Sequence, residues 1–302
     1  MSPTIAFITS RKEPLLHWFF DSLALQLDEP VSVIVIDALK ESRPENYYVE
    51  RWFESGLIGE LKSSVPKPTI WQGKHRITKE DWWAKSNAMN TAICLCKTEW
   101  IAIVDDRCVL TPKWLQCVRD AMEGNYAVCG RYEKRANLKV YNGEIVDYGE
   151  LLGVDQRPEF TEAVPTRDWY GGSCAVPIEW CLQLNGFSED LCDGLGSEDS
   201  MFGVTLRNSG LPMKYDARMK IIEDRTPGEA YEGALKRADK NPELGQRAKS
   251  WDIVRAFIGK TSSQNSFDIR DMRARILNGE DWRPPSASHL DWYDQQPISE
   301  MQ

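Results

Sequence analysis

Histidine is scarce in this chain of 302 residues, and the cysteines do not form metal-binding pairs. The three histidines, His17, His75 and His289, are far apart in the sequence. The eight cysteines lie between Cys94 and Cys192 without a CxxC spacing. Neither a zinc site nor a disulfide scaffold is therefore expected, and we interpret the cysteines as buried thiols of the core.

Long apolar runs, an excess of positive charge and phosphate-binding glycine loops are also absent. No uninterrupted run of about 18 apolar residues occurs and no leader segment precedes the first expected strand, so we expect a soluble, cytoplasmic protein. The net charge of −9 argues against a broad nucleic-acid surface. Without a GxGxxG motif, a Walker A motif or a glycine-rich first turn, dinucleotide binding and P-loop chemistry are disfavoured.

Short apolar runs alternate with helical spacing over the first 110 residues, which predicts a βαβ arrangement with a parallel sheet. Strands are expected at 4–8, 31–36 and 100–104, with a further short strand near 65–68. Helices are expected at 15–27, 47–61 and 85–93. The small, polar first turn of the helix at 85–93 suits contact with a phosphate or a ribose.

The pattern changes after a helix at 112–122. A strand at 126–132 and short stretches up to about residue 162 are joined by hairpin-like connections, which predicts mixed or antiparallel strands. A helix at 178–184, a helix starting at Glu198 and a strand at 219–222 follow. Residues 229–302 are expected to form a helical extension, with helices at 229–238, 242–258 and 268–277. We expect this extension to pack beside the body of the protein or against a second subunit, in a homo-oligomer.

Pairs of carboxylates stand at the ends of expected strands and at a helix start. The pairs are Asp105-Asp106, Glu198-Asp199 and Glu223-Asp224, and Asp37 ends the second strand. One such pair is equally explained as a helix cap or a solvated turn. Neighbouring carboxylates repel each other unless a cation lies near them, so several pairs favour a divalent metal that holds a phosphorylated ligand.

The order and spacing of these motifs resemble the GT-A fold nucleotide-sugar glycosyltransferases, in particular the inverting family 2. Residues 169–173, 185–187 and 196–199 also resemble the acceptor-side signature of the β-1,4-galactosyltransferases and polypeptide GalNAc-transferases. The resemblance covers about residues 3–228. It implies an α/β fold of GT-A type with a nucleotide-binding half at 1–110, an acceptor half at 111–228, and the C-terminal extension at 229–302.

The resemblance also implies roles for residues on the donor side. A nucleotide-sugar, with uridine as the expected nucleoside, would be bound through its base, ribose and diphosphate by seven residues: Thr9, Arg11, Asp37, Arg76, Lys85, Asn87 and Asp105. A Mn²⁺ or Mg²⁺ ion would be held by Asp106 together with Glu223 or Asp224. Arg107 stands where many members of the family have the second aspartate of their metal motif.

On the acceptor side the resemblance implies that Asp199 is the general base, with Glu198 as its partner in the acidic pair. Three further residues would line the pocket for the donor sugar and the acceptor: Trp169, Gly171 and Gly172. Two adjacent glycines permit close approach of the backbone to a ligand. The flexible segment 194–196 is expected to close over the donor.

Two other functions remain open from the sequence. A nucleotidyltransferase that forms a nucleotide-sugar would share the architecture, but it should carry a glycine-rich basic loop, which residues 9–13 lack. A non-catalytic nucleotide- or sugar-binding module is the second alternative. For a transferase, the acceptor hydroxyl could belong to a glycan, a protein, a lipid or a modified base of DNA, since residues 74–76 and 131–139 are locally basic.

Overall fold

The computed structural model describes most of the first 227 residues and part of the C-terminal region. The described ranges are 2–44, 47–48, 56–67, 84–157, 169–193, 197–227, 259–263 and 265–280. The expected site residue Arg76, the segment 194–196 and the expected helices at 229–238 and 242–258 lie outside these ranges.

Four parallel strands form the first half of the central sheet. The elements of this half are β1 (Thr4–Thr9), α1 (Leu16–Ala24), β2 (Val31–Asp37), η1 (Lys40–Ser42), β3 (Ile58–Ser64), α3 (Lys85–Leu95) and β4 (Trp100–Asp105). The strand order is β3-β2-β1-β4. In this register Thr9 lies beside Asp37 and Ile8 lies beside Asp105. Both acidic residues are therefore at the carboxyl edge of the sheet, as the sequence predicts.

The second half extends the sheet with strands of both directions. Its elements are β5 (Cys108–Leu110), α4 (Trp114–Gly124), β6 (Ala127–Ala136), β7 (Lys139–Tyr141), β8 (Glu144–Asp147), β9 (Glu150–Val154), β10 (Ser173–Pro177), α5 (Ile178–Gln183), α6 (Glu189–Cys192), α7 (Glu198–Asn208) and β11 (Met213–Asp224). The order continues β4-β10-β6-β11-β5, with β9 paired to β6, whereas β7 and β8 pair with each other in a separate two-stranded sheet. β10 is antiparallel to both of its neighbours, so the predicted mixed sheet is confirmed.

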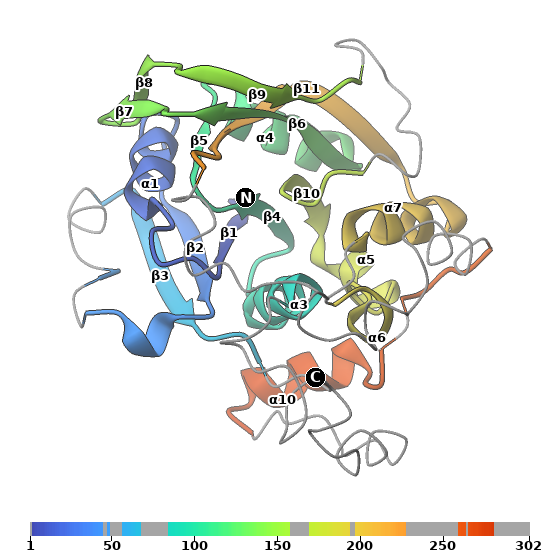
Figure 1. Ribbon diagram of the computed structural model, residues 1–302. Coiled ribbons are helices and arrows are strands. Elements are labelled where there is room, and N and C mark those ends of the chain that lie inside the picture. Colours follow the sequence, from blue (N-terminus) through green and yellow to red (C-terminus); the bar gives the residue numbers. More distant parts are fainter. Residues whose placement is uncertain are drawn as a thin grey trace, which may run out of the picture.

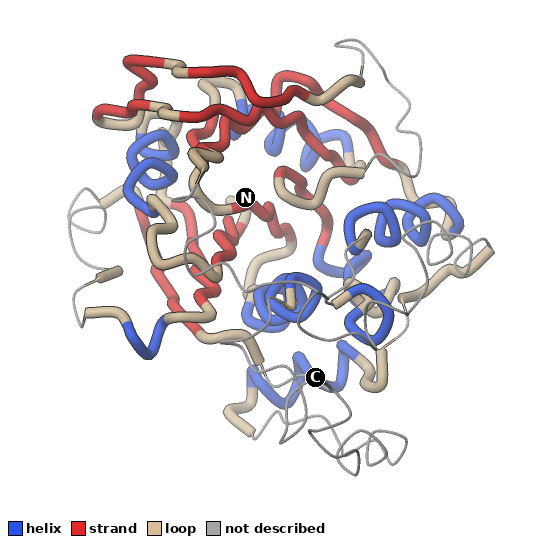
Figure 2. The backbone as a smooth tube through the Cα atoms, in the orientation of Figure 1, coloured by secondary structure: helices blue, strands red, loops and turns tan. Residues whose placement is uncertain are grey.

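Helices cover both faces of this curved sheet (Figure 1, Figure 2). Alternate residues of β1 separate two cores. Phe7 packs with Phe19 of α1 and Trp114 of α4 on one face. Ile8 on the opposite face shares a core with Ile93 of α3 and Phe202 of α7. A fully buried side chain of this kind contributes about 1.5–3 kcal/mol, so both layers hold the sheet edge in place.

The expected helix at 47–61 is wrong in its second part. Residues from Ile58 onward form β3, which pairs with β2 through neighbours such as Val33 and Leu61. The strand ends at Ser64, before the stretch 65–68 where the sequence predicts a short strand. β3 lies at the margin of the sheet and its side chains are mostly half-buried, so its apolar pattern is weak.

A described part of the C-terminal region packs on the body of the protein. The expected helix at 268–277 is confirmed as α10 (Ile269–Leu277), and the Asp268 carboxylate accepts a hydrogen bond from the amide of Arg270 at 2.7 Å. α10 lies beside α3 (Figure 1), with Ile269 and Met272 in the same core as Ile93. No helix in the described ranges has both the length and the apolar character needed to cross a membrane.

Candidate active site

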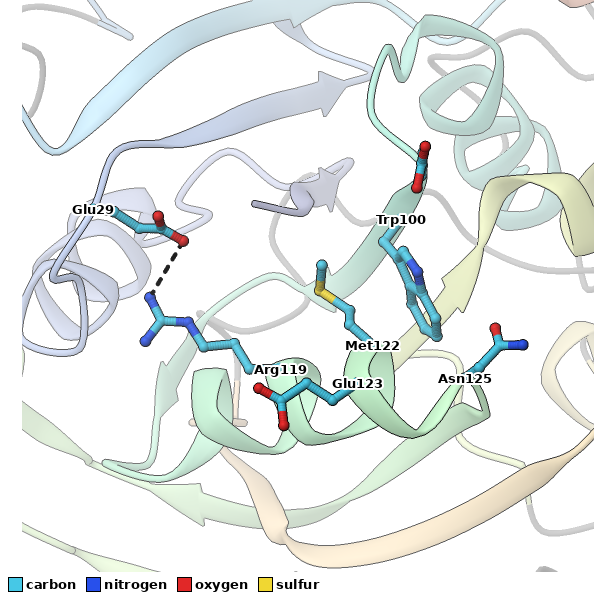
Figure 3. Close-up of a pocket in the computed structure, with 7 residues that line it drawn as sticks. Glu29, Trp100, Arg119, Met122, Glu123 and Asn125 are labelled. Carbon is cyan, nitrogen blue, oxygen red and sulfur yellow. Dashed lines mark ion pairs between the residues drawn. The ribbon is translucent and has the colours of Figure 1, made fainter. Parts of the chain in front are cut away.

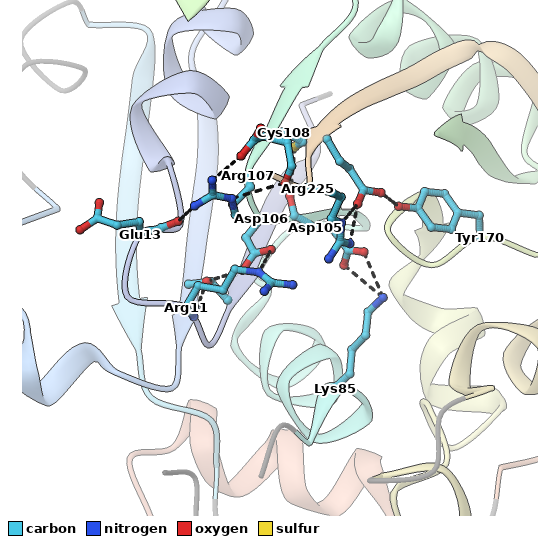
Figure 4. A network of polar contacts seen from close by, with 12 residues as sticks. Arg11, Glu13, Lys85, Asp105, Asp106, Arg107, Cys108, Tyr170 and Arg225 are labelled. Carbon is cyan, nitrogen blue, oxygen red and sulfur yellow. Dashed lines mark hydrogen bonds and ion pairs between the residues drawn. The ribbon is translucent and has the colours of Figure 1, made fainter. Parts of the chain in front are cut away.

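The carboxyl ends of β1, β4 and β11 meet the first turns of α3 and α7 in one polar region. Ile8 of β1 pairs with Asp105 of β4, and Glu223 of β11 pairs with Cys108, which follows β4 closely. Lys85 and Glu198 are the first residues of α3 and α7. Figure 4 shows the part of this region around the end of β4. Residues more than 100 positions apart in the sequence are thereby brought together, as the strand-end pattern predicts.

Asp106 is held by two residues that follow β1. Its Oδ2 atom accepts a hydrogen bond from the Thr9 hydroxyl at 2.6 Å, and its Oδ1 atom accepts one from Arg11 Nε at 2.9 Å. The Arg11 and Asp106 side chains are 12% and 10% exposed. The guanidinium of Arg11 therefore neutralises Asp106, which the sequence predicts to be a metal ligand.

Lys85 extends from the start of α3 toward Asp105 (Figure 4) and lies among three carboxylates. Its Nζ atom lies 3.1 Å from Asp105, 3.6 Å from Glu198 and 3.9 Å from Asp199. Burial by itself opposes the charge of Lys85, but the three carboxylates outweigh it and raise the pKa of the ammonium group. This ammonium group helps like charges from two elements, β4 and α7, to lie close together.

Asp199 has the features of a general base. Its side chain is 20% exposed, and its Oδ1 atom is buried without a hydrogen-bond partner among the described residues. Burial is the largest influence and raises its pKa. Lys85 and the amide of Gly171 lower it and Glu198 and Asp105 raise it, so that the pKa of Asp199 is about 7. A carboxylate with a pKa near the working pH can take a proton from a substrate hydroxyl.

Gly171 and Gly172 allow the loop before β10 to run directly against these carboxylates. A Cβ atom on Gly171 would lie 2.5 Å from Asp199 Oδ1 and 3.1 Å from Met89 Cε. A Cβ atom on Gly172 would collide with Asp105 Oδ2 and with the Tyr170 hydroxyl. The absence of side chains at both positions is thus a steric requirement of the acidic cluster itself.

Glu223 is fully buried and has two partners that the sequence did not identify. The Tyr170 hydroxyl donates a hydrogen bond to Glu223 Oε1, and Arg225 Nε donates one to Oε2 at 2.7 Å (Figure 4). Burial and the nearby carboxylates raise the pKa of Tyr170 well above its ordinary value, so the phenol keeps its proton. Tyr170 is 53 positions from Glu223 in the sequence, so no local motif reveals this pairing.

Arg107 and Asp224 form a second pair behind this site. They are ion-paired, and the Arg107 guanidinium also donates to the Glu13 carbonyl at 2.8 Å (Figure 4). Asp224 Oδ1 in turn accepts a hydrogen bond from the Thr226 hydroxyl at 2.6 Å. Arg107 itself has a left-handed backbone, with φ of 54°, at the turn from β4 to β5. The Asp-Asp-Arg sequence therefore closes a tight turn, and Asp224 is used in holding it.

Three of the expected site residues are placed in buried contacts of their own. Asp37 is fully buried and accepts hydrogen bonds from Arg43 Nε at 2.8 Å and from the Tyr48 hydroxyl at 2.7 Å. Asn87 donates to Glu189 at 3.2 Å in a buried network. Trp169 is 2% exposed and packs against Phe202, with no partner for its ring nitrogen among the described residues.

The donor set does not fit a resident divalent metal ion. Asp106 already binds Arg11, Glu223 binds Arg225 and Tyr170, and Asp105 binds Lys85. In the described part of the chain no three histidine, cysteine, aspartate or glutamate side chains are grouped so as to hold a metal. A divalent ion would have to displace one of these basic side chains, and ligation by Asp106 with Glu223 or Asp224 stays a prediction.

We expect Mn²⁺ alone to have little effect on the folded protein, because its carboxylates are already paired with cations. Millimolar Mn²⁺ or EDTA should each change the melting temperature of the nucleotide-free protein by less than about 1 °C, since stabilisation by a ligand requires binding to the folded state. Thermal unfolding followed by circular dichroism measures this effect. An increase of several degrees with Mn²⁺ in the absence of nucleotide would show that a metal site exists.

The cavity in Figure 3 is at the opposite edge of the sheet from this site. It has a volume of about 500 Å³ and is bordered by Trp100, where β4 begins, whereas Asp105 ends the same strand. Glu29, Glu99 and Glu123 face this cavity with one cation, Arg119. Ligands of open α/β sheets bind at the carboxyl ends of the strands, so the carboxyl edge is the better candidate site.

The family model of glycosyl transferase family 2 matches residues 67–163, which include Lys85, Asp105 and Asp106. A search of curated protein sequences finds no significant match. The likeness to the β-1,4-galactosyltransferase and GalNAc-transferase acceptor motif stays a prediction.

Solved structures with a similar fold include S. aureus TarS 1-349 in complex with UDP, with a TM-score of 0.51 and 12% identity over 77% of this chain and 63% of that chain. TarS 1-349 in a second structure has a TM-score of 0.51 and 13% identity, over 74% of this chain and 60% of that one. The complex of TarS 1-349 with UDP-GlcNAc has a TM-score of 0.50 and 12% identity, over 97% of this chain and 70% of that one. This chain thus spans less than two thirds of the first two structures, with which it shares the GT-A fold.

Proposed function

We propose that this protein is an inverting glycosyltransferase that moves a sugar from a nucleotide-sugar to an acceptor hydroxyl, with Asp199 as the general base. The observation that carries the proposal is the state of the Asp199 carboxylate. It has a pKa of about 7, a buried Oδ1 atom without a hydrogen-bond partner among the described residues, and a neighbouring carboxylate, Asp105, at the carboxyl edge of the sheet.

The donor side of the proposal rests on the fold and on the charges at the strand ends. A TarS fragment of similar fold binds UDP in one structure and UDP-GlcNAc in another, so we propose a UDP-sugar as the donor. Arg11, Lys85 and Arg225 present three cationic groups beside Asp105 and Asp106. Cations fixed at the point where a diphosphate leaves stabilise the charge that develops in the transition state.

The reaction is a single displacement at the anomeric carbon. The acceptor oxygen attacks this carbon while Asp199 takes the proton of the acceptor hydroxyl. The bond from the anomeric carbon to the diphosphate oxygen breaks, and the electron pair leaves with the nucleoside diphosphate. A new glycosidic bond with inverted configuration, a protonated Asp199 and a free nucleoside diphosphate result. A base at the acceptor side with the leaving group on the opposite side is the arrangement that such a displacement requires.

We expect the purified protein to release UDP from a UDP-sugar in the presence of hydroxyl acceptors, and to form a product of inverted anomeric configuration. The measurement combines a panel of UDP-sugars with glycan, peptide, lipid and modified-DNA acceptors, and proton NMR of the anomeric coupling constant. Retention of configuration would contradict the role of Asp199 as base. Formation of a nucleotide-sugar from a nucleoside triphosphate and a sugar phosphate would favour the nucleotidyltransferase instead, and binding of UDP-sugars without turnover would favour the non-catalytic module.

A further inference from the structure

We propose that Lys85 is a positioning residue for the base: it keeps Asp199 ionised and joins it to Asp105 on the donor side. This role rests on the proposed function of Asp199. It gives Lys85 a second task, because the sequence predicts only that Lys85 contacts the nucleotide. The ammonium group would then act in the acceptor half of the reaction as well as beside the donor.

The backbone of Lys85 is held firmly enough for such a role. Lys85 is the first residue of α3, and the Asp193 carboxyl group accepts hydrogen bonds from the next two amides, Ser86 at 2.7 Å and Asn87 at 3.1 Å. Further along α3, Asn90 donates to Glu189 at 2.8 Å. Asp193 and Glu189 belong to α6 and its C-terminal end, so the start of α3 is tied to the chain segment that leads to α7.

The side chain of Lys85 bridges two elements of the site. Its Nζ atom lies 3.1 Å from Asp105 Oδ1 and 3.9 Å from Asp199 Oδ1, and the side chain is 18% exposed. Asp199 Oδ1 accepts no hydrogen bond from the described residues, and the ionised form of the carboxylate is favoured by the Lys85 ammonium group together with the Gly171 amide. An opposite charge within about 4–6 Å favours the ionised form of a carboxyl group.

Groups from several elements contribute to the charge state of Asp199. Glu198 precedes it on α7, Asp105 faces it from β4, and the Gly171 amide reaches it from the loop before β10. Two thiols also lie near Asp199: Cys174 on β10 and Cys192 at the end of α6. Burial raises the pKa of both thiols. The carboxylates and burial raise the pKa of Asp199, whereas Lys85 and the Gly171 amide lower it.

The proposal predicts shifts of opposite sign in two variants. Lys85→Met removes the cation and should raise the pKa of Asp199 by about one unit or more, because a nearby opposite charge is worth about one to three units. Asp105→Asn removes a like charge and should lower it. Lys85→Arg keeps the cation and should leave the pKa close to that of the native protein.

The experiment is an NMR titration of the Asp199 carboxyl carbon in protein labelled with ¹³C-aspartate, with the signal assigned by its loss in Asp199→Asn. It measures the pKa without turnover and is complemented by the pH profile of kcat/KM. The expected result is an upward shift in Lys85→Met, a downward shift in Asp105→Asn and none in Lys85→Arg. If Lys85→Met does not fold, Lys85→Gln, which also removes the positive charge, takes its place in the titration with the same expected upward shift.

An unchanged pKa in Lys85→Met, or an equal rise in Lys85→Arg, would overturn the role of Lys85. If the pKa of Asp199 is unchanged in Lys85→Met, the lysine acts on the donor alone. Lys85→Met would then show a higher KM for the UDP-sugar and an unchanged pH profile. A failure of the proposed function is a different result: the native protein would transfer no sugar, although the NMR titration would still report how Lys85 affects Asp199.

Discussion

Asp199→Asn should lower the rate of sugar transfer by about 10³-fold, within the range of 10²–10⁴ that a positioned general base supplies. The amide has the same size as the carboxylate but cannot take a proton from the acceptor hydroxyl. UDP should still bind with nearly native affinity, because Arg11 and Lys85 remain in place beside Asp105. Steady-state transfer assays and isothermal calorimetry with UDP measure the two properties separately.

The matched control is Asp28→Asn, since Asp28 is 72% exposed and pairs with Arg119 far from the carboxyl edge. It should retain native activity. In the native protein kcat/KM should fall as the pH drops below about 7, because Asp199 then becomes protonated, and this acidic limb should be lost in the residual activity of Asp199→Asn. Near-native transfer by Asp199→Asn would show that another group removes the proton.

Gly171→Ala should reduce kcat by about 10²-fold, because a shift of about 1 Å at a reacting group can cost that much. The added Cβ atom would lie 2.5 Å from Asp199 Oδ1 and 3.1 Å from Met89 Cε, so the carboxylate must move away from the loop. Displacement also removes Asp199 from the Gly171 amide, which lowers its pKa in the native structure. The acidic limb of the pH profile should therefore move upward together with the loss of rate.

Gly153→Ala is the control for this variant, since no atom lies within 4 Å of a Cβ at that position on β9. It should leave the rate and the pH profile unchanged. The affinity for UDP should be similar in both variants, because neither position touches Arg11 or Lys85. Native kcat in Gly171→Ala would indicate that Asp199 does not need its observed position, and would count against it as the base.

The sequence predicts best those strands that are buried on both faces. β1, β2 and β4 are continuous apolar runs that begin and end close to the predicted limits. β3 was not predicted because its alternation is weak and its place is set by pairing with β2. β5 and β10, of three and five residues, are too short for periodicity and depend on neighbours distant in the chain.

The carboxylates of the site were predictable, whereas their partners were not. A strand ending in Asp105-Asp106 and a helix starting with Glu198-Asp199 are local patterns, and both lie at the carboxyl edge. The cations that balance them come from elsewhere in the fold: Arg11 is 95 residues from Asp106. A metal was expected because the sequence shows several carboxylates together but does not show which basic side chains face them.

The capped start of α3 has a consequence for donor recognition. Both amides that follow Lys85 are bonded to the Asp193 carboxyl group, so an internal acid already fills the place that a phosphate occupies at many helix ends. A diphosphate at this edge would meet long, bendable side chains such as Lys85 and Arg11 instead of rigid main-chain donors. Donors that carry sugars of different shape could then be admitted by rotamer changes, with the polypeptide path left as it is.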